Sequence, residues 1–488
     1  MNYIVIVAIL FPVIAGLLIP YFKFSKSKRQ IYTISAVLMT SLLALLVIFL
    51  GNNEPLTLIS LTSQMPIAFK VDGLSKVFLL LIAILWPLAT LYAFEYMEHE
   101  PNHDRFFMLY TLTFGVVIGL ATSANLVTFY FMYECLTFAT LPLVMHAMDR
   151  RAIKAGRKYF QYSIFGAALA FCGMMILMHY GSSIDFVYGG VLASNTIGNQ
   201  LNIVLFGYLL MFFGFGVKAA IFPFHGWLPS AGVAPTPVTA LLHAVAVVKA
   251  GVFAIMRVTF YSFGTAVLYG TWAQYVALGF ACFTIVFGST MAFKEQHLKR
   301  RFAYSTISNL SYILVGISLM TPLGLAGALA HMFFHGIMKI CLFFCVGVVM
   351  EKTHKEFVYQ IEGFGRKMPV TFVCFTVGAC ALSGIPLFAG FVSKAALGSA
   401  AVAQSSIFSL IVVMSLLLSA ILTAAYTFEI SIKAFIPHKG FNTHRLDGKK
   451  DPEWMMKTPL LTLSALMILF GIWAGPIMEF FTQVAKGL

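Results

Sequence analysis

Long apolar runs recur along the whole sequence and constrain its fold more than any other feature. Hydrocarbon offers the backbone no hydrogen-bond partners, so a run of about 20 apolar residues predicts a membrane-spanning helix. The composition agrees, because 60% of the residues are hydrophobic and only 10% are charged. Fourteen runs are long enough to span, at residues 3–22, 30–50, 75–95, 106–122, 123–145, 159–180, 201–224, 236–262, 266–292, 302–320, 323–350, 368–396, 405–430 and 458–482. We therefore predict an all-α integral membrane protein with about 14 transmembrane helices.

Basic residues in the loops predict how these spans are oriented. The first run, Tyr3–Phe22, has no positive residue before it and several after it, which predicts a retained span and not a cleaved signal peptide. Loops after odd-numbered spans hold 24 of the 32 lysines and arginines, whereas the other loops hold only Lys70, Lys76, Arg257 and Lys486. The positive-inside rule then places both termini on the outer side of the cell's inner (cytoplasmic) membrane. These flanking charges explain the net charge of +14. We therefore expect the chain to interact with a lipid bilayer and not with nucleic acid.

Five ionisable residues lie deep within predicted spans and belong to no loop: Glu134, Lys218, Lys249, Lys339 and Lys394. A charge at this depth is costly and typically marks a pathway for ions or protons. We therefore interpret the four lysines and the single carboxylate as groups that hold and pass protons.

Two predicted spans, the seventh and the twelfth, combine glycine and proline next to one of these lysines. The interruptions are expected at Gly214, Gly216 and Pro223 beside Lys218, and at Gly384, Pro386 and Gly390 before Lys394. Two such breaks five spans apart predict a five-helix unit repeated in opposite orientations, as in many secondary transporters. The expected divisions are the first three spans (1–105), one repeat of spans 4–8 (106–262), an inverted repeat of spans 9–13 (263–436), and a loop with span 14 (437–488).

Glu134 and Lys218 are the deep residues best suited to form a switch. Loss of hydration disfavours the charged form of a lysine, whereas a nearby carboxylate favours it, so moving the carboxylate changes the protonation of the lysine. Lys249 would be the next proton acceptor. A fixed Glu134–Lys218 ion pair that only holds two helices together is the structural alternative.

Histidines accompany the lysine of the eleventh span. His331, His335 and Lys339 recur at i, i+4 and i+8 and so share one helix face, where imidazoles could relay protons. Histidines that only bond to backbone carbonyls between helices are the alternative. His243 precedes Lys249 by six residues, so the two share a relay only if the eighth span is bulged.

Other chemistry has little support in the sequence. The seven cysteines form no Cys-x-x-Cys or Cys/His cluster, so we expect no metal site and no cofactor on this chain. Walker, dinucleotide-binding and Ser/His/Asp signatures are absent from the sequence, and we assign no catalytic residues.

Several stretches around the deep residues resemble the antiporter-like membrane subunits shared by respiratory complex I, energy-converting membrane-bound hydrogenases and Mrp-type multisubunit sodium/proton antiporters. The resemblance covers nearly the whole chain. Its most specific parts are YECLTFATLPL around Glu134, VKAAIFPFHGWLPSAGVAPTPVTALLH around Lys218, VVKAGVFAIMR at Lys249, LKRRFAYSTISNLSYI, HMFFHGIMKICLFF at Lys339 and GIPLFAGFVSK ending at Lys394, and VDGLSKVFLLL is a weaker one.

This resemblance implies a fold of fourteen helices with inverted repeats and assigns roles to four residues. Glu134 and Lys218 match the family's Glu–Lys pair, Lys249 matches its central lysine, and Lys394 matches a terminal position that is Lys or Glu. The partners it implies are homologous antiporter-like subunits, small membrane subunits and a peripheral redox module, with iron–sulfur or hydrogenase cofactors on those other chains. Protons are the expected cargo, and sodium is a second candidate.

Three functions follow from these observations. We favour a proton-translocating subunit of a redox-driven complex, such as a complex I-like or hydrogenase complex. The alternative is a subunit of an Mrp-type sodium/proton antiporter. A membrane scaffold without transport is disfavoured, because it would retain the costly buried charges without using them.

Overall fold

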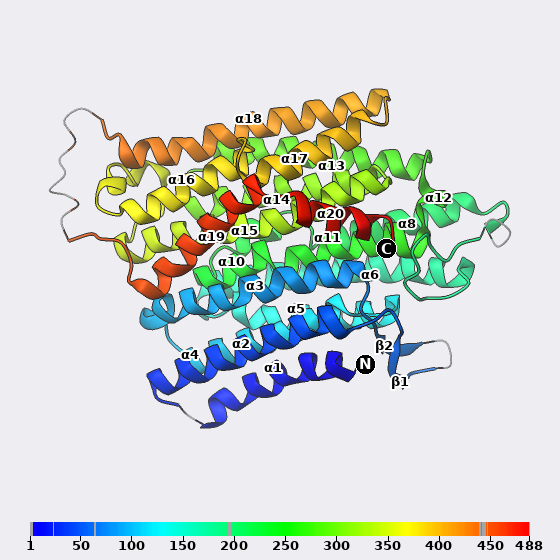
Figure 1. Cartoon of the computed structure of the whole chain (residues 1–488), viewed down its shortest axis with the longest axis horizontal. Helices are drawn as coiled ribbons and strands as arrows, with labels where there is room; N and C mark the ends of the chain where they lie inside the picture. Colours follow the sequence, from blue (N-terminus) through cyan, green and yellow to red (C-terminus); the bar gives the residue numbers. More distant parts are fainter. Residues whose placement is uncertain are drawn as a thin grey trace.

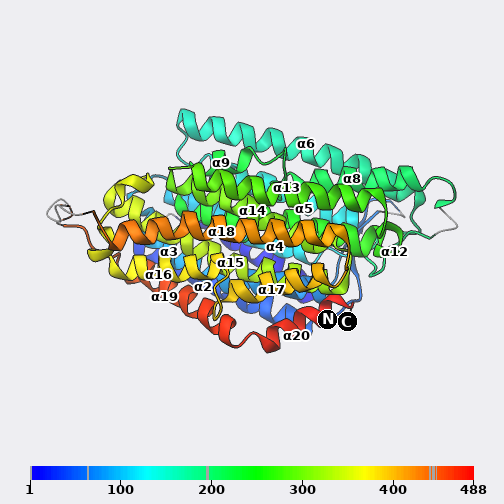
Figure 2. The same ribbon diagram turned by 90° about the horizontal axis from the view of Figure 1, so that it is seen from above.

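The computed structural model describes residues 3–22, 24–62, 65–193, 197–438, 441, 446 and 448–487. Its helices run side by side along the long axis of the molecule, and both termini lie at the same end (Figures 1 and 2). Within these ranges, eleven helices are long and apolar enough to cross a membrane, and three more apolar helices are shorter. The predicted all-α membrane fold is thereby confirmed.

The amino-terminal part contains three helices and a small hairpin. Its elements are α1 (Tyr3–Phe22), α2 (Lys26–Leu50), the antiparallel strands β1 (Leu56–Ser60) and β2 (Pro66–Phe69), α3 (Gly73–Tyr96) and the 3-10 turn η1 (Met97–His99).

The segment expected to be the first repeat contains three continuous helices followed by two interrupted ones. Its elements are α4 (His103–Ala121), α5 (Leu126–Val144), α6 (Arg150–Tyr180), α8 (Leu201–Gly216), α9 (Trp227–Ala231), α10 (Thr236–Ala244), α11 (Val247–Arg257) and the π-helix η2 (Val258–Phe263).

The remaining segment follows the same pattern, with a broken helix in the fourth position and a closing pair at the end. Its elements are α12 (Thr265–Leu268), α13 (Trp272–Lys294), α14 (Leu298–Ser318), α15 (Pro322–Thr353), η3 (Val358–Gln360), η4 (Phe364–Arg366), α16 (Pro369–Ser383), α17 (Ala389–Val402), α18 (Ile407–Phe435), α19 (Trp454–Ile472) and α20 (Gly475–Ala485). The matching order agrees with the predicted repeats, whose boundaries stay a prediction.

Polar side chains at the loop ends start several of these helices. Each accepts a hydrogen bond from a backbone N–H in the first turn, which would otherwise have no partner within the helix. The capping residues are Asp72 for α3, Asn125 for α5, Asp149 for α6, Thr321 for α15 and Ser406 for α18.

Burial separates the central helices from those at the edge. In Figure 1, α1 and α18 form opposite edges of the molecule, and α15 lies between them. The membrane-spanning window of α15 is completely buried, as is that of Thr236–Phe263, whereas only 28% of the α18 window is buried. The two fully enclosed segments are therefore the ones that carry Lys249 and Lys339.

Both predicted interruptions are confirmed. Residues 217–226 between α8 and α9 are not helical, and residues 384–388 separate α16 from α17, where Gly384 adopts a left-handed conformation with φ of 87°. Gly216, Pro223 and Pro386 lie at the ends of these helices or within the breaks.

The prediction that Gly214 and Gly390 interrupt a helix was wrong, because both lie inside helices. A Cβ on Gly214 would lie 2.5 Å from the backbone nitrogen of Ala170, and one on Gly390 would meet the carbonyl of Ala381. These glycines therefore permit close backbone packing, of α8 on α6 and of α17 on the end of α16, and do not end a helix.

The eighth span contains an interruption that the glycine and proline pattern did not predict. The backbone N–H groups of Val245 and Ala246 both donate to the carbonyl of Leu241, so one extra residue is inserted between α10 and α11. This arrangement is the local bulge of a π-type turn, which often occurs at functional positions.

Candidate functional site

Lys218 lies in the break that follows α8, and its side chain is buried. Its Nζ donates a 2.5 Å hydrogen bond to the carbonyl oxygen of Tyr133 and lies 3.4 Å from the centre of the Tyr133 ring. The non-helical backbone brings Lys218 to α5, which carries both Tyr133 and Glu134. A carbonyl dipole and an aromatic face thus stabilise the amine in place of water.

Glu134 is next to this lysine without bonding to it. Within the described part of the chain, neither carboxylate oxygen of Glu134 has a hydrogen-bond partner, and no salt bridge joins it to Lys218. The two side chains still interact electrostatically, and Glu134 is half-buried. The structural alternative of a fixed, bonded Glu134–Lys218 pair therefore does not describe this conformation.

Lys249 and His335 form the most direct contact between predicted site residues. The Nζ of Lys249 on α11 lies 2.8 Å from Nδ1 of His335 on α15, and both residues are fully buried. The tautomer of His335 decides which atom is the donor. In either case this bond allows a proton to pass between an amine and an imidazole.

His331 extends this contact toward the second broken helix. The rings of His331 and His335 have centroids 5.8 Å apart, and His331 Nδ1 lies 2.9 Å from the hydroxyl of Ser393 on α17. His331 also stacks on Tyr312, with centroids 5.2 Å apart. The imidazole ladder therefore ends beside Lys394.

Lys394 lies on α17, six residues after the break, and its amine points back to the end of α16. Its Nζ donates to the carbonyl of Leu382 at 2.7 Å and lies 5.1 Å from the centre of the Tyr312 ring. The carbonyl of Leu382 has no helical partner to saturate it because α16 ends at Ser383. The predicted relation between the break and the lysine is thus present in the structure.

Lys339 connects to a different set of groups, one turn from His335 on α15. Its Nζ donates to the hydroxyl of Ser305 at 2.7 Å, and that hydroxyl lies 2.6 Å from the Tyr426 hydroxyl on α18. The carbonyl of Tyr426 accepts a 3.0 Å bond from Arg301, which is paired with Glu429 at 2.7 Å. This branch leads from the buried centre to Glu429, which is partly exposed at the loop end of α18.

His243 is fully buried, and both of its ring nitrogens lack a hydrogen-bond partner among the described residues. The bulge after α10 meets the condition under which His243 could serve the same relay as Lys249. Lys339 and Lys299 are cations that act electrostatically on His243. Its ring packs on Phe343 with centroids 4.7 Å apart. His243 therefore belongs with the Lys339 branch.

A polar cavity opens near this branch at the end of the molecule where the basic loops lie. Its volume is about 590 Å³, and its lining includes Glu356, His297 and the buried residue Lys299. The amine of Lys299 donates to the carbonyl of Ala234 at 3.0 Å. Lys299 thus lines this cavity and also acts electrostatically on His243.

The structure joins Lys249, His335, His331, Lys339 and Lys394 into one neighbourhood, but Glu134 and Lys218 form a separate one. The backbone of Lys218 touches Gly251 of α11, where a Cβ would lie 2.8 Å from the Lys218 carbonyl carbon, yet its amine points to α5. The sequence analysis missed the hydroxyl-bearing partners, which are Ser305, Ser393, Tyr312 and Tyr426. Their only sequence signal is hydroxyl residues within apolar spans, as in AYSTISNLSY.

No group of three His, Cys, Asp or Glu residues within the described ranges could hold a metal ion. The array of lysines and histidines lacks carboxylate and thiolate ligands. Amines, imidazoles and hydroxyls in contact can exchange protons, and this is the chemistry that the array allows.

Comparisons with known proteins agree on one family. Residues 123–421 match the family described as NADH:quinone oxidoreductase/Mrp antiporter, transmembrane, and residues 59–107 match the family of the complex I chain 5 N-terminus. Among individual proteins, an Na(+)/H(+) antiporter subunit of Alkalihalophilus pseudofirmus is 28% identical over 82% of this chain and 52% of its own length. The NAD(P)H-quinone oxidoreductase chain 4 1 of a Picosynechococcus species is 31% identical over 79% of this chain and 72% of its own length.

Two solved structures share the fold along almost the whole chain. One chain of an archaeal membrane-bound sulfane sulfur reductase aligns with a TM-score of 0.85 at 24% identity, covering 99% of this chain and 97% of the other. One chain of the Mrp complex from a Dietzia species aligns with a TM-score of 0.84 at 21% identity, covering 100% and 98%. The chain spans only 52% and 60% of the length of the first two curated relatives. With its family region matched over residues 123–421, the chain belongs to the NADH:quinone oxidoreductase/Mrp antiporter family of transmembrane subunits.

Proposed function

We propose that this chain is a proton-translocating subunit of a multisubunit, redox-driven ion pump in a cell's inner membrane. The observation that carries the proposal is the buried contact between Lys249 and His335, which continues through His331 to Lys394. A scaffold would gain little from these groups, since each of them is costly to bury.

In this proposal Glu134 and Lys218 act as the input that drives the array. The carboxylate of Glu134 is free to move, because it has no hydrogen-bond partner among the described residues. Its approach would stabilise the ammonium of Lys218, and its withdrawal would favour proton release. The two side chains interact at a distance in this conformation, which fits one position of such a switch.

Protons would reach the array from the basic end of the molecule. The cavity that contains Lys299 and the hydroxyl branch of Ser305 and Tyr426 both approach Lys339 from that end. We propose that this end faces the cell interior, as the positive-inside rule predicts. Lys394 would then release protons toward the outer side.

The partners are proposed to be homologous antiporter-like subunits, small membrane subunits and a peripheral redox module that carries the iron–sulfur or hydrogenase cofactors. The alternative is a subunit of an Mrp-type sodium/proton antiporter, which the 28% identity to an Na(+)/H(+) antiporter subunit favours. The same buried array would serve either complex, with sodium as a second cargo in the alternative.

Purification of the intact complex through a tag on this chain tests the proposal in two ways. Mass spectrometry identifies the copurifying chains: hydrogenase or quinone-module subunits support the redox pump, whereas only homologues and small membrane proteins support the antiporter. The complex is then reconstituted in liposomes with a pH-sensitive dye. Acidification that persists at the parental rate after Lys249→Met and Lys394→Met would overturn proton translocation by this chain.

A further inference from the structure

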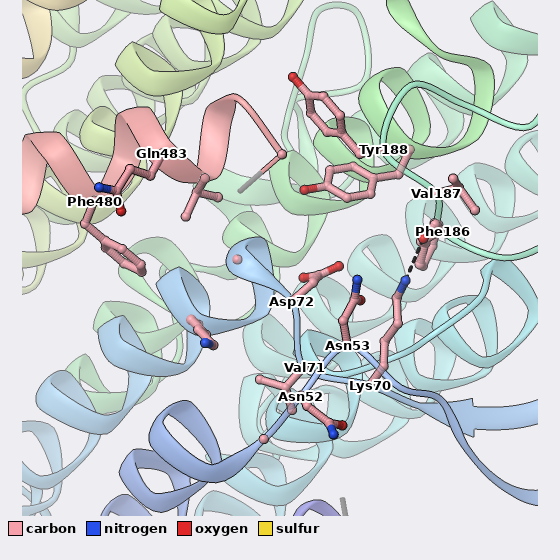
Figure 3. Close-up of a pocket in the computed structure, with 16 residues that line it drawn as sticks. Asn52, Asn53, Lys70, Val71, Asp72, Phe186, Val187, Tyr188, Phe480 and Gln483 are labelled. Atoms are coloured by element: carbon pink, nitrogen blue, oxygen red, sulfur yellow. Dashed lines mark hydrogen bonds between the residues drawn. The ribbon is translucent and has the colours of Figure 1, made fainter.

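A second cavity, of about 620 Å³, lies at the end of the molecule that holds both termini. Four parts of the chain meet there: the segment between α2 and α3 with the first turn of α3, the loop after α6, η2, and the end of α20. Figure 3 shows Lys70, Asp72, Asn53 and Gln483 around this cavity, with Phe480 forming part of its wall. None of these residues belongs to the array of lysines and histidines described above.

Lysine and arginine residues are few at this end of the molecule, and those present lie at or beside this cavity. Lys70 and Lys76 line it, Arg257 is paired with its Asp72, and Lys486 directly follows α20, whose last turns line it. Loops at this end otherwise lack lysine and arginine. The positive-inside rule does not account for cations on this side, and a bound anion would account for their convergence.

Among the described residues that line the cavity, Asp72 is the one with a carboxylate, and this carboxylate is already neutralised. Asp72 accepts hydrogen bonds from the guanidinium of Arg257 and from the backbone and hydroxyl of Ser75. Burial raises the pKa of this carboxyl, but Arg257, the backbone N–H of Ser75 and Lys70 together lower it below its ordinary value, so Asp72 stays ionised. With Arg257 and Asp72 balanced, the remaining charged side chains among the described lining residues are Lys70 and Lys76.

Most of the side-chain N–H groups of Lys70, Lys76, Asn53 and Gln483 form no hydrogen bond with the described residues. The Nζ of Lys70 donates one hydrogen bond, to the carbonyl of Phe186 at 2.6 Å. The side chains of Lys76, Asn53 and Gln483 make no hydrogen bond or ion pair with the described residues. Burial lowers the pKa of the Lys70 ammonium, an effect that Asp72 and Asp185 oppose, and a further negative charge beside it would stabilise its charged form.

Apolar surface continues directly from the cavity. Phe49 and Leu50, the last residues of α2, are 80% and 47% exposed and precede Gly51, which lines the cavity. Phe480 and Val484 of α20 supply an apolar wall on the other side. A ligand with a negative head and hydrocarbon chains would place its head on the lysines and its chains against α2.

We propose that this cavity binds the phosphate of an anionic phospholipid, held by Lys70, Lys76, Asn53 and Gln483, with its acyl chains along the exposed end of α2. The bound lipid would join α3 to α20, which already touch where a Cβ on Gly73 would lie 2.9 Å from Val484. This site is independent of the proposed proton array. Inorganic phosphate shares the same head chemistry but would not use the apolar surface.

Native mass spectrometry of the full chain, delipidated in detergent, tests the proposal. Phosphatidylglycerol, phosphatidylcholine and inorganic phosphate are titrated separately. Phosphatidylglycerol should bind more tightly than the other two, and Lys76→Gln should weaken its binding about fivefold, as expected for the loss of one lysine near a lipid surface. Lys28→Gln, at the opposite end of α2, is the matched control and should bind as the parent does.

Gln483→Ala is a second test variant that should fold normally, because Gln483 is exposed. Its loss should weaken phosphatidylglycerol binding without disturbing the core. Equal binding of phosphatidylglycerol and phosphatidylcholine, or unchanged binding in both Lys76→Gln and Gln483→Ala, would overturn the site. Tight binding of inorganic phosphate alone would overturn the lipid assignment. An acidic side chain of another protein found in the cavity of the intact complex would likewise overturn it.

Discussion

The Nζ atom of Lys249 lies 2.8 Å from Nδ1 of His335, although 86 residues separate them in sequence. Both side chains are fully buried, on the two most enclosed helical segments of the chain. Each residue therefore provides the polar partner that the other lacks in an apolar interior. A proton on either nitrogen can be shared across this bond.

Loss of this contact should stop proton movement. Lys249→Met and His335→Gln should each lower driven proton pumping at least about a hundredfold, the usual contribution of a positioned acid or base. If the two act as one unit, the double variant should be no worse than either single variant. His179→Gln, at the exposed end of α6, is the control, and additive losses would show that Lys249 and His335 act separately.

Glu134 and Lys218 should be required for coupling and not for folding. Glu134→Gln and Lys218→Ala should greatly reduce pumping while the complex still assembles, because Glu134 has no hydrogen-bond partner among the described residues and Lys218→Ala removes a single bond, to the Tyr133 carbonyl. Assembly is checked by native electrophoresis, and pumping by dye quenching in vesicles. Glu98→Gln, on the surface, should leave both readouts unchanged. Assembled variants that pump at the parental rate would exclude the coupling role.

Lys394 should act through its ability to carry a proton. Lys394→Met nearly keeps the volume but removes the titratable group, so pumping should be abolished. Lys394→Glu reverses the charge but can still bind a proton, so partial activity should remain. Pumping is compared in the same liposome preparation for both variants. The opposite order of activities would identify Lys394 as a positive structural anchor.

The hydroxyl branch from Lys339 should set the rate of proton uptake. Ser305→Ala and Tyr426→Phe each remove a link between Lys339 and α18 and should slow pumping about tenfold, as the loss of one hydrogen-bonded link would. Ser311→Ala on the same helix is the control, because its buried hydroxyl has no hydrogen-bond partner among the described residues. Equal rates in all three variants would remove this branch from the pathway.

The Arg257–Asp72 pair should contribute to stability. Asp72→Asn leaves the buried guanidinium uncompensated, which costs about 3–5 kcal/mol, whereas Asp72→Asn combined with Arg257→Met should recover much of that loss. Since the pKa of Asp72 is lowered in the fold, its contribution is present above the ordinary value of 3.8 and is lost as the pH falls below it. Thermal unfolding in detergent measures both effects. Glu98→Gln, which breaks the exposed pair with Lys26, should change the unfolding temperature little.

The sequence alone determined which parts of this chain cross the membrane and which ionisable residues lie inside it. Apolar run length predicted the helices, because hydrocarbon forces the backbone to satisfy its own hydrogen bonds. The breaks beside Lys218 and Lys394 followed from local glycine and proline, and the ladder of His331, His335 and Lys339 from helical periodicity alone. Each of these features depends on residues that are close in sequence.

Tertiary structure decided which of those residues meet. That Lys249 bonds to His335, and that Glu134 lies near Lys218 without a hydrogen bond to it, depends on how α11, α15 and α5 pack. The bulge before Lys249 comes from the backbone hydrogen bond of Ala246 to the Leu241 carbonyl, and no glycine or proline in this stretch predicts it. The contact of Arg257 with Asp72, 185 residues away, depends in the same way on where distant helix ends meet. Residue type and spacing fix the face of a helix, but its neighbours are fixed by the packing of the whole bundle.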